Sequence, residues 1–417
     1  MCRRPDPVAS PNDKPSLMRY GLPMPTIRIL HVITGLGLGG TETWLTRLLP
    51  RLPRERFECR VVSLLDLDGE AGALAGDIRA LDVPVHSLGL RRGRPSPAAF
   101  LQLVGLLRQW RPQVVQTWLY HADLLGLLAA RASRCGAAVS WGLRGAYMDF
   151  SRYGLATRLT VRACAALSRW PEAVTANSHA GAAHHLGLGY RPRRLVVLEN
   201  GVDVECFQPD AAARTRLRAQ WRTGEGTPLV GLVARVDSMK GHAVFCRAAA
   251  LVLRRRADVR FVFCGAGTEP GAEELDRFVA AHGLEAAAIR LGRRADVAAV
   301  IGALDVLALA SLGEGFPNVV AEALACSVPV AALDVGDARR MTGPGGMVAA
   351  PEASGPGADA ETQALALADL LCRMLELSAE ERADMGARGR AHVLANYAAE
   401  AAAARWAAHF ESLGGTR

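Results

Sequence analysis

Short apolar runs alternate with longer amphipathic stretches along most of the chain, a pattern that predicts strands joined by helices. In the first half of the chain the apolar runs lie at residues 27–33, 59–65, 83–86, 114–118, 138–142, 173–177 and 195–198. In the second half they lie at 229–234, 259–264, 288–291, 305–310 and 329–333. Strands that alternate with helices are typical of parallel sheets covered by helices on both faces. We therefore expect an α/β protein with two doubly wound, Rossmann-like domains.

Length and composition set the expected domain boundaries. A chain of 417 residues is longer than one core usually accommodates. Residues 1–25 are rich in proline and lack an apolar pattern, so we expect a disordered tail. The turn-forming sequence E-N-G-V-D at 199–203 predicts a hinge. The expected domains are therefore 26–200 and 201–385, followed by a C-terminal helix at 386–417 that crosses back to the first domain.

The loop after the apolar run at 305–310 has the features of a phosphate site. Ligands of doubly wound sheets bind outside the carboxyl ends of the strands. Here S-L-G-E-G-F-P-N-V-V-A-E continues from Ser311, and its glycines allow the backbone to lie close to a ligand. Pro317 suits the first position of a helix. Backbone N–H groups at such a helix start favour a phosphate, and here they belong to Gly315, Phe316, Asn318 and Val319.

Two carboxylates flank this expected phosphate site. Glu314 lies in the loop and Glu322 lies about a turn and a half into the helix. Carboxylates repel phosphate, so their natural partners are neutral hydroxyl groups, which a sugar nucleotide supplies on both sides of its diphosphate. Taken alone, the pair fits a solvated loop residue and a surface helix residue better.

A second loop carries two cations. G-L-V-A-R-V-D-S-M-K-G-H places Arg235 and Lys240 after the strand at 229–234, where they suit a diphosphate. The chain has only two lysines, Lys14 and Lys240, beside 47 arginines. This scarcity suggests that a compact ammonium is needed at the loop, because a guanidinium is larger and planar. Chance retention of Lys240 is the alternative.

The first loop of the chain also fits a dinucleotide-binding site. G-L-G-L-G-G-T-E at 35–42 contains G-x-G-x-x-G and, with Asp66 after the second strand, imitates a dinucleotide-binding fingerprint. An NAD-dependent oxidoreductase is therefore an alternative. D-L-D at 66–68 also has the D-x-D form that can hold manganese and a diphosphate, although an acidic turn fits it equally well.

Charge is uneven along the chain. Residues 1–200 hold 26 Lys plus Arg against 14 Asp plus Glu, which gives +12, and the rest holds 23 against 27, which gives −4. The basic half fits an anionic membrane or a phosphorylated acceptor. A solvated surface is an equal alternative, whereas nucleic acid is not expected because the usual motifs are missing. The arginines considered are Arg91, Arg92, Arg94, Arg144, Arg152, Arg158, Arg162 and Arg169.

These motifs together resemble those of the retaining family 4 glycosyltransferases, which have the GT-B fold of two Rossmann-like domains facing a central cleft. The resemblance covers nearly the whole chain after residue 26 and rests on E-x7-E at 314–322, G-F-P-N, V-P-V, R-x4-K at 235–240 and G-G-x-E at 39–42. It implies that Glu314 meets the transferred sugar and Glu322 the ribose. It further implies that the diphosphate is held by Arg235 and Lys240 and approached by the loop of Gly39 and Gly40, and that Gly265 and Gly267 form a close turn near the nucleotide.

Other segments fit the resemblance less completely. His121 matches a family histidine near the transferred sugar, although a structural histidine is an equal alternative, and nearby Asp123 is the expected N-cap of its helix. D-V-G-D-A at 334–338 fits the family, but Arg339, Arg340 and Met341 depart from the milder residues expected there, and 351–363 resembles an inserted loop. His179, His184 and His185 lack the spacing of a metal site.

The expectation is a cytoplasmic, metal-independent, retaining glycosyltransferase that needs no cofactor and uses a nucleotide-sugar donor. Glu314, His121, Lys240 and Arg235 are the expected catalytic residues. The resemblance favours a lipid-linked or saccharide acceptor and a role in surface polysaccharide or glycolipid synthesis, with peripheral attachment to the membrane. A silent sugar-nucleotide binding protein is the other alternative. Scattered cysteines without C-x-x-C, and no signal peptide, favour the cytoplasm.

Overall fold

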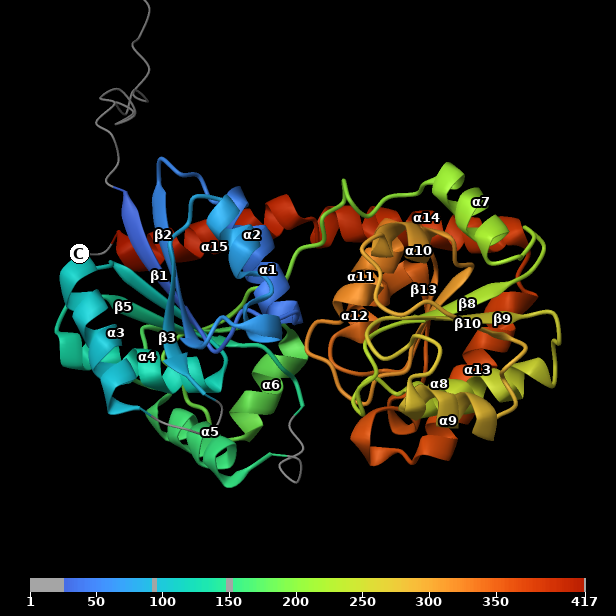
Figure 1. Cartoon of the computed structure of the whole chain (residues 1–417), viewed down its shortest axis with the longest axis horizontal. Coiled ribbons are helices and arrows are strands. Elements are labelled where there is room, and N and C mark those ends of the chain that lie inside the picture. The colour runs from blue at the N-terminus through green and yellow to red at the C-terminus, as the bar shows by residue number, and fades with distance from the viewer. Residues whose placement is uncertain (1–25, 92–95, 148–152, 416–417) are drawn as a thin grey trace, which may run out of the picture.

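A computed structural model describes residues 26–91, 96–147 and 153–415. The chain forms two lobes side by side, each a parallel sheet covered by helices (Figure 1). The expected tail at 1–25 lies outside the described residues. The two-sheet α/β architecture that the apolar pattern predicted is confirmed.

The first sheet has seven parallel strands in the order β3-β2-β1-β4-β5-β6-β7. Its strands are β1 (Ile27–Ile33), β2 (Phe57–Leu65), β3 (Val85–Leu90), β4 (Val114–Trp118), β5 (Ala138–Leu143), β6 (Ala173–Ala176) and β7 (Leu195–Val197). The central strand β1 pairs with β2 from Ile27 opposite Phe57 and with β4 from Ile29 opposite Val114. Both faces of β4 and β5 are buried, which is why these segments read as continuous apolar runs.

The second sheet has six parallel strands in the order β10-β9-β8-β11-β12-β13. Its strands are β8 (Leu229–Val233), β9 (Arg260–Cys264), β10 (Ala288–Arg290), β11 (Val306–Leu309), β12 (Val330–Ala332) and β13 (Gly346–Val348). The sequence pattern did not predict β13, because three residues that begin with glycine carry almost no apolar signal.

Helices join the strands of both sheets. In the first lobe they are α1 (Gly40–Leu48), α2 (Ala75–Ala80), α3 (Pro97–Trp110), α4 (Tyr120–Ser133), α5 (Leu155–Leu167) and α6 (His179–Gly187). In the second lobe they are α7 (Ala211–Gln220), α8 (His242–Leu253), α9 (Glu273–Ala281), α10 (Val297–Gly302), α11 (Asn318–Ala325), α12 (Ala338–Thr342) and α13 (Ala360–Glu376). The stretch 351–363, read as an inserted loop, contains two short 3-10 turns and the start of α13.

Strand order places a ligand crevice in each lobe. The order in which successive strands are added to the sheet reverses between β1 and β4 in the first sheet and between β8 and β11 in the second, while all strands stay parallel. Ligands bind at such switch points because the loops leave the sheet in opposite directions there. The loops that follow β1, β4, β8 and β11 carry most of the residues that the sequence singled out.

The chain crosses between the lobes twice, and the two crossings touch. The single helix expected at 386–417 is two helices, α14 (Ala379–Asn396) and α15 (Ala399–Gly414), which run along one edge of both lobes (Figure 1). The 199–203 segment runs beside the junction of these helices, where Val202 forms a bridge with Ala398. Trp406 of α15 packs on Trp118 of β4 with ring centroids 5.0 Å apart, which anchors α15 on the first lobe.

The expected N-cap role of Asp123 is wrong. Leu119 occupies the N-cap of α4, and Asp123 lies inside the first turn, fully buried. Its carboxylate accepts hydrogen bonds from the Thr117 hydroxyl at 2.5 Å and from the Gly142 N–H at 3.3 Å. The side chain therefore ties α4 to two strands and does not cap a helix.

We expect Asp123→Asn to stabilise the first lobe above neutral pH. Burial raises the pKa of Asp123 to about 8, so the folded state keeps a proton that the unfolded chain releases near its ordinary pKa. At pH values between the pKa of Asp123 in the unfolded chain and its pKa in the folded protein, the folded state binds more protons than the unfolded state. The free energy of unfolding therefore falls as pH rises, by up to about 1.4 kcal/mol per pH unit. Denaturant unfolding at pH 5 and pH 8 measures this. The advantage of the variant over the parent should grow with pH, and a pH-independent difference would contradict the assignment.

Candidate functional site

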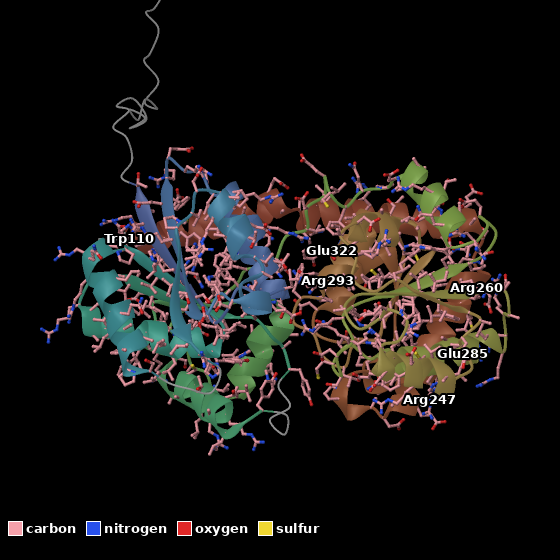
Figure 2. All side chains as sticks on the ribbon, in the orientation of Figure 1. Trp110, Arg247, Arg260, Glu285, Arg293 and Glu322 are labelled. Atoms are coloured by element: carbon pink, nitrogen blue, oxygen red, sulfur yellow. The ribbon has the colours of Figure 1, made fainter. Side chains whose placement is uncertain are left out.

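A cleft of about 1200 Å³ lies between the two lobes and receives residues from both sheets. In Figure 2, Glu322 and Arg293 lie on the side of the second lobe that faces the first. The lining includes most of the predicted donor site: Gly39, Gly40, Arg235, Lys240, Gly265, Glu314, Gly315, Phe316, Pro317, Asn318, Val319 and Glu322. Gly267 and His121 are not among the lining residues.

Lys240 and Glu314 meet inside the cleft. The Lys240 Nζ donates to Glu314 Oε1 at 2.6 Å, and the Ser311 hydroxyl donates to the same oxygen at 2.8 Å. Arg235 is more exposed and pairs with Asp237 at 3.4 Å. A fixed ammonium beside a fixed carboxylate can contact a phosphate on one side and a sugar hydroxyl on the other.

Glycine is required where the Lys240 loop turns into α8. Gly241 has φ 68°, and a Cβ at this position would lie 1.9 Å from the Ala310 carbonyl oxygen. Gly265 is similarly constrained, because a Cβ there would lie 2.2 Å from the Ala234 carbonyl oxygen. These glycines let the loops after β8, β9 and β11 pack against one another, which brings the cations and Glu314 together.

Glu322 faces a cation from the opposite lobe. Arg47 of α1 approaches Glu322 Oε1 at 3.4 Å, and both side chains are largely enclosed. Burial raises the pKa of Glu322, while the charge of Arg47 and its hydrogen bond act in the opposite direction. Arg47 could not be predicted from any motif, since the pair forms only when the lobes face each other.

The start of α11 supplies backbone donors to the cleft. Pro317 precedes the helix as its N-cap residue, so its expected place at the first helical position is off by one residue. The first N–H groups of a helix have no acceptor one turn earlier, and here the first two belong to the cleft-lining Asn318 and Val319. The next, from Val320, donates to the Pro317 carbonyl at 2.9 Å. Asn318 Oδ1 accepts a hydrogen bond from Asn200 Nδ2 at 3.0 Å, which links this helix start to the crossing segment.

Arg144 lies in the cleft wall, although charge counting grouped it with surface arginines. It follows β5, and its guanidinium stacks over the Trp118 ring, 5.1 Å from the centroid. Its Nη2 donates to Asn200 Oδ1, whereas Nε and Nη1 are enclosed without a partner among the described residues. Burial lowers the pKa of Arg144 to about 9, and the nearby Glu42 carboxylate raises it. The cleft therefore has basic groups on both walls.

The histidines are placed differently from one another. His121 lies in the first turn of α4 with an exposed side chain, next to the cleft-lining Leu119, and partial burial lowers its pKa. Its role at the sugar stays a prediction. His185 is buried and bonded to the Tyr120 hydroxyl at 2.7 Å. Within the described residues, no three His, Cys, Asp or Glu side chains gather as a metal site would require.

Two sequence families match the two lobes. Residues 38–206 match the family described as Glycosyltransferase Family 4, and residues 227–375 match Glycosyl transferases group 1. The chain belongs to the family 4 glycosyltransferases of the GT-B fold. This assignment excludes the alternative of an NAD-dependent oxidoreductase. The glycine-rich loop at 35–42 instead lines the cleft of a glycosyltransferase.

Individual glycosyltransferases are similar over different lengths. The chain is 26% identical to the putative glycosyltransferase EpsF of Bacillus subtilis over 325 residues, 72% of this chain and 78% of EpsF. It is 35% identical to a D-inositol 3-phosphate glycosyltransferase of Salinispora arenicola over 164 residues, which are only 35% of each protein. The crystal structure of Anabaena HepE in complex with UDP superposes with a TM-score of 0.77 at 21% identity, over 93% of this chain and all of HepE.

Proposed function

We propose that this glycosyltransferase transfers a sugar from a nucleotide-sugar donor to an acceptor hydroxyl with retention of anomeric configuration. The observation that carries the proposal is the convergence of Arg235, Lys240, Glu314 and Glu322 on one cleft beside the start of α11. The nucleotide diphosphate lies against the two cations and the helix N–H groups, which neutralise the charge that develops as the glycosidic bond breaks.

The remaining side chains receive roles from their positions. Glu322, in the middle of α11, accepts hydrogen bonds from the ribose hydroxyls, and Glu314 contacts the transferred sugar. His121, in the first turn of α4 beside the cleft-lining Leu119, contacts the same sugar. We assign no protein nucleophile. The acceptor attacks on the leaving-group face of the sugar, and the departing phosphate takes the acceptor proton while Lys240 and Arg235 hold it in place.

A panel of UDP-, GDP-, ADP- and TDP-sugars tests the donor class. A ligand that binds only the folded state raises the melting temperature, and the rise grows with the logarithm of ligand concentration over dissociation constant. UDP-glucose is the first candidate, because Anabaena HepE has been crystallised with UDP-glucose. At least one sugar nucleotide should stabilise the protein and then be consumed. Stabilisation without any hydrolysis or transfer would instead favour a silent binding protein.

We expect transfer to persist in EDTA. Arg235, Lys240 and the N–H groups of α11 supply the positive potential that a divalent cation supplies in other transferases. Initial rates measured with 5 mM EDTA, about the usual chelating excess, should stay within about twofold of the untreated rate. Loss of activity that manganese restores would contradict metal independence and favour a manganese site at Asp66 and Asp68.

The acceptor is proposed to be lipid-linked or saccharide, in surface polysaccharide or glycolipid synthesis at the inner face of the cytoplasmic membrane. Support comes from one face of the first lobe, where Leu155 and Leu159 of α5 are 69% and 52% exposed beside Arg158, Arg162 and Arg169. Arg92, Arg94 and Arg152 lie outside the described residues. No helix in the described part of the chain is both long and apolar enough to cross a bilayer.

We expect the protein to sediment with anionic liposomes at low salt and to be released at 1 M salt, where the Debye length is about 3 Å. The double variant Arg162→Gln with Arg169→Gln should bind less. Its matched control changes Arg254 and Arg255, exposed arginines of the second lobe, to Gln and alters net charge equally. Equal loss in both variants, or equal recovery with neutral lipid, would mean that the arginines of the first lobe are only solvated.

A further inference from the structure

The segment 334–341 departs from the expected family pattern, and the structure gives its unusual residues partners. Arg339 of α12 pairs at 2.9 Å with Asp334, which lies in the turn before this helix. Arg340 approaches Glu199 of the crossing segment at 3.6 Å, and Met341 is buried in the core of the second lobe. The three unexpected residues therefore belong to α12 and have structural partners, and the turn before α12 ends at Asp337.

Asp337 binds the start of α6 across the lobes. Its Oδ2 accepts the His179 N–H and its Oδ1 accepts the Ala180 N–H, both at 2.8 Å. The next donor of the same turn, the Gly181 N–H, is satisfied by Ser178 within the first lobe at 3.0 Å. A carboxylate suits this place because helix N-terminal donors are unsatisfied and carry partial positive charge. Two N–H groups at the start of α6 therefore have as their acceptor a carboxylate more than 150 positions away in the sequence.

The same turn also holds the loop that carries Glu314. The Asp337 N–H donates to the Gly315 carbonyl at 3.2 Å. Gly336 has φ 57°, and a Cβ there would lie 2.1 Å from the Glu314 carbonyl oxygen. On its other side Gly315 faces the first lobe, since a Cβ on it would lie 2.9 Å from Asn177 Oδ1. The start of α6, the Glu314 loop and the Asp337 turn therefore meet at one point.

We propose that Asp337 is a positioning residue that couples closure of the two lobes to the placement of Glu314. Its carboxylate holds α6 while its backbone holds Gly315, so the Glu314 carboxylate is set at its distance from Lys240 only when the lobes are together. The inference rests on the proposed function for the part that concerns the transferred sugar. A misplacement of about 1 Å can cost as much as 100-fold in rate, so a residue outside the reacting groups can have a large effect.

Asp337→Ala and Asp337→Asn test this, with Asp334→Ala as the matched control. Asp334 lies in the same turn and pairs with Arg339, but its described contacts stay within the second lobe. The asparagine keeps the shape of the side chain but offers an amide N–H₂ to one of two donors, so it should show part of the alanine effect. Thermal unfolding of all variants establishes that each is folded.

Two measurements separate closure from chemistry. Small-angle X-ray scattering should show a larger radius of gyration for Asp337→Ala than for the parent and for Asp334→Ala. In UDP-glucose hydrolysis, Asp337→Ala should lower kcat at least about tenfold while the calorimetric affinity for UDP changes less than about threefold. The reason is that the groups proposed to bind the nucleotide, Arg235, Lys240 and Glu322, all belong to the second lobe.

The possible failures are distinguishable. If the parent protein neither binds nor consumes any sugar nucleotide, the proposed function fails, while scattering still tests closure. If the parent is active and Asp337→Ala has the radius of gyration of Asp334→Ala, the inference is overturned. It is also overturned if Asp337→Ala opens the lobes but keeps the parental kcat, since closure would then not position Glu314.

Discussion

Replacing Glu314 with alanine is expected to lower kcat about 100-fold or more and to leave the affinity for nucleoside diphosphate nearly unchanged. The reason is that the proposed partner of Glu314 is the transferred sugar, where positive charge develops only as the glycosidic bond breaks. Lys240, which is proposed to bind the phosphate, remains in the cleft of the variant. Glu314→Gln should recover little, because it keeps the hydrogen bond from Ser311 but loses the charge.

Glu322→Ala should give the opposite result. A hydrogen bond from a ribose hydroxyl to a carboxylate contributes about 1.5–3 kcal/mol, so its loss should weaken nucleoside diphosphate binding about tenfold or more. The variant also leaves Arg47 without its carboxylate partner in an enclosed site, which adds to the loss. Calorimetry with the nucleoside diphosphate alone compares the two variants. The assignment of roles is contradicted if Glu314→Ala loses more affinity than Glu322→Ala.

Lys240→Arg is expected to lower kcat at least tenfold, about 1.4 kcal/mol of transition-state stabilisation, although the charge is kept. The ammonium lies 2.6 Å from Glu314 Oε1 in a loop that Gly241 holds tightly against Ala310. A planar guanidinium cannot occupy that space without moving Glu314 or the loop. The matched control is Arg235→Lys, at the more exposed cation of the same loop, which should cost less.

Steady-state kinetics on the best donor of the panel measures both variants. Full kcat in Lys240→Arg would mean that Lys240, the single lysine among the described residues, was retained by chance, and the argument from lysine scarcity would fail.

Local chemistry was readable from the sequence because each motif carries its own strand, turn and helix start. The segment 311–322 shows this best, since Gly315, Pro317 and the two glutamates all line the cleft within one residue of their expected places. The apolar runs predicted strands for the same reason, because both faces of these strands are buried. What failed locally was Asp123, whose type suits a cap but whose hydrogen-bond partners come from β4 and the end of β5.

Contacts between the lobes were not readable. Arg47 meets Glu322, Asn200 meets Asn318 and Asp337 meets α6 only because the two sheets face each other, and no spacing within one segment encodes that arrangement. Arg144 was grouped with surface arginines because charge counting ignores where a strand ends, whereas β5 delivers it into the cleft. Residue types at a single loop predict chemistry, while the partner across a cleft depends on the docking of whole domains.

The claim that this cleft binds the diphosphate of a nucleotide sugar is tested most directly by one calorimetric series. The parent protein is titrated with a nucleoside, its monophosphate and its diphosphate, using the base that gives the largest thermal stabilisation. Arg235, Lys240 and the start of α11 line the cleft and are the groups proposed to bind phosphate. The account therefore predicts that affinity rises with each added phosphate, and that Lys240→Gln removes most of the affinity gained with the second phosphate. Equal affinity across the series, or a gain that Lys240→Gln leaves intact, would contradict it.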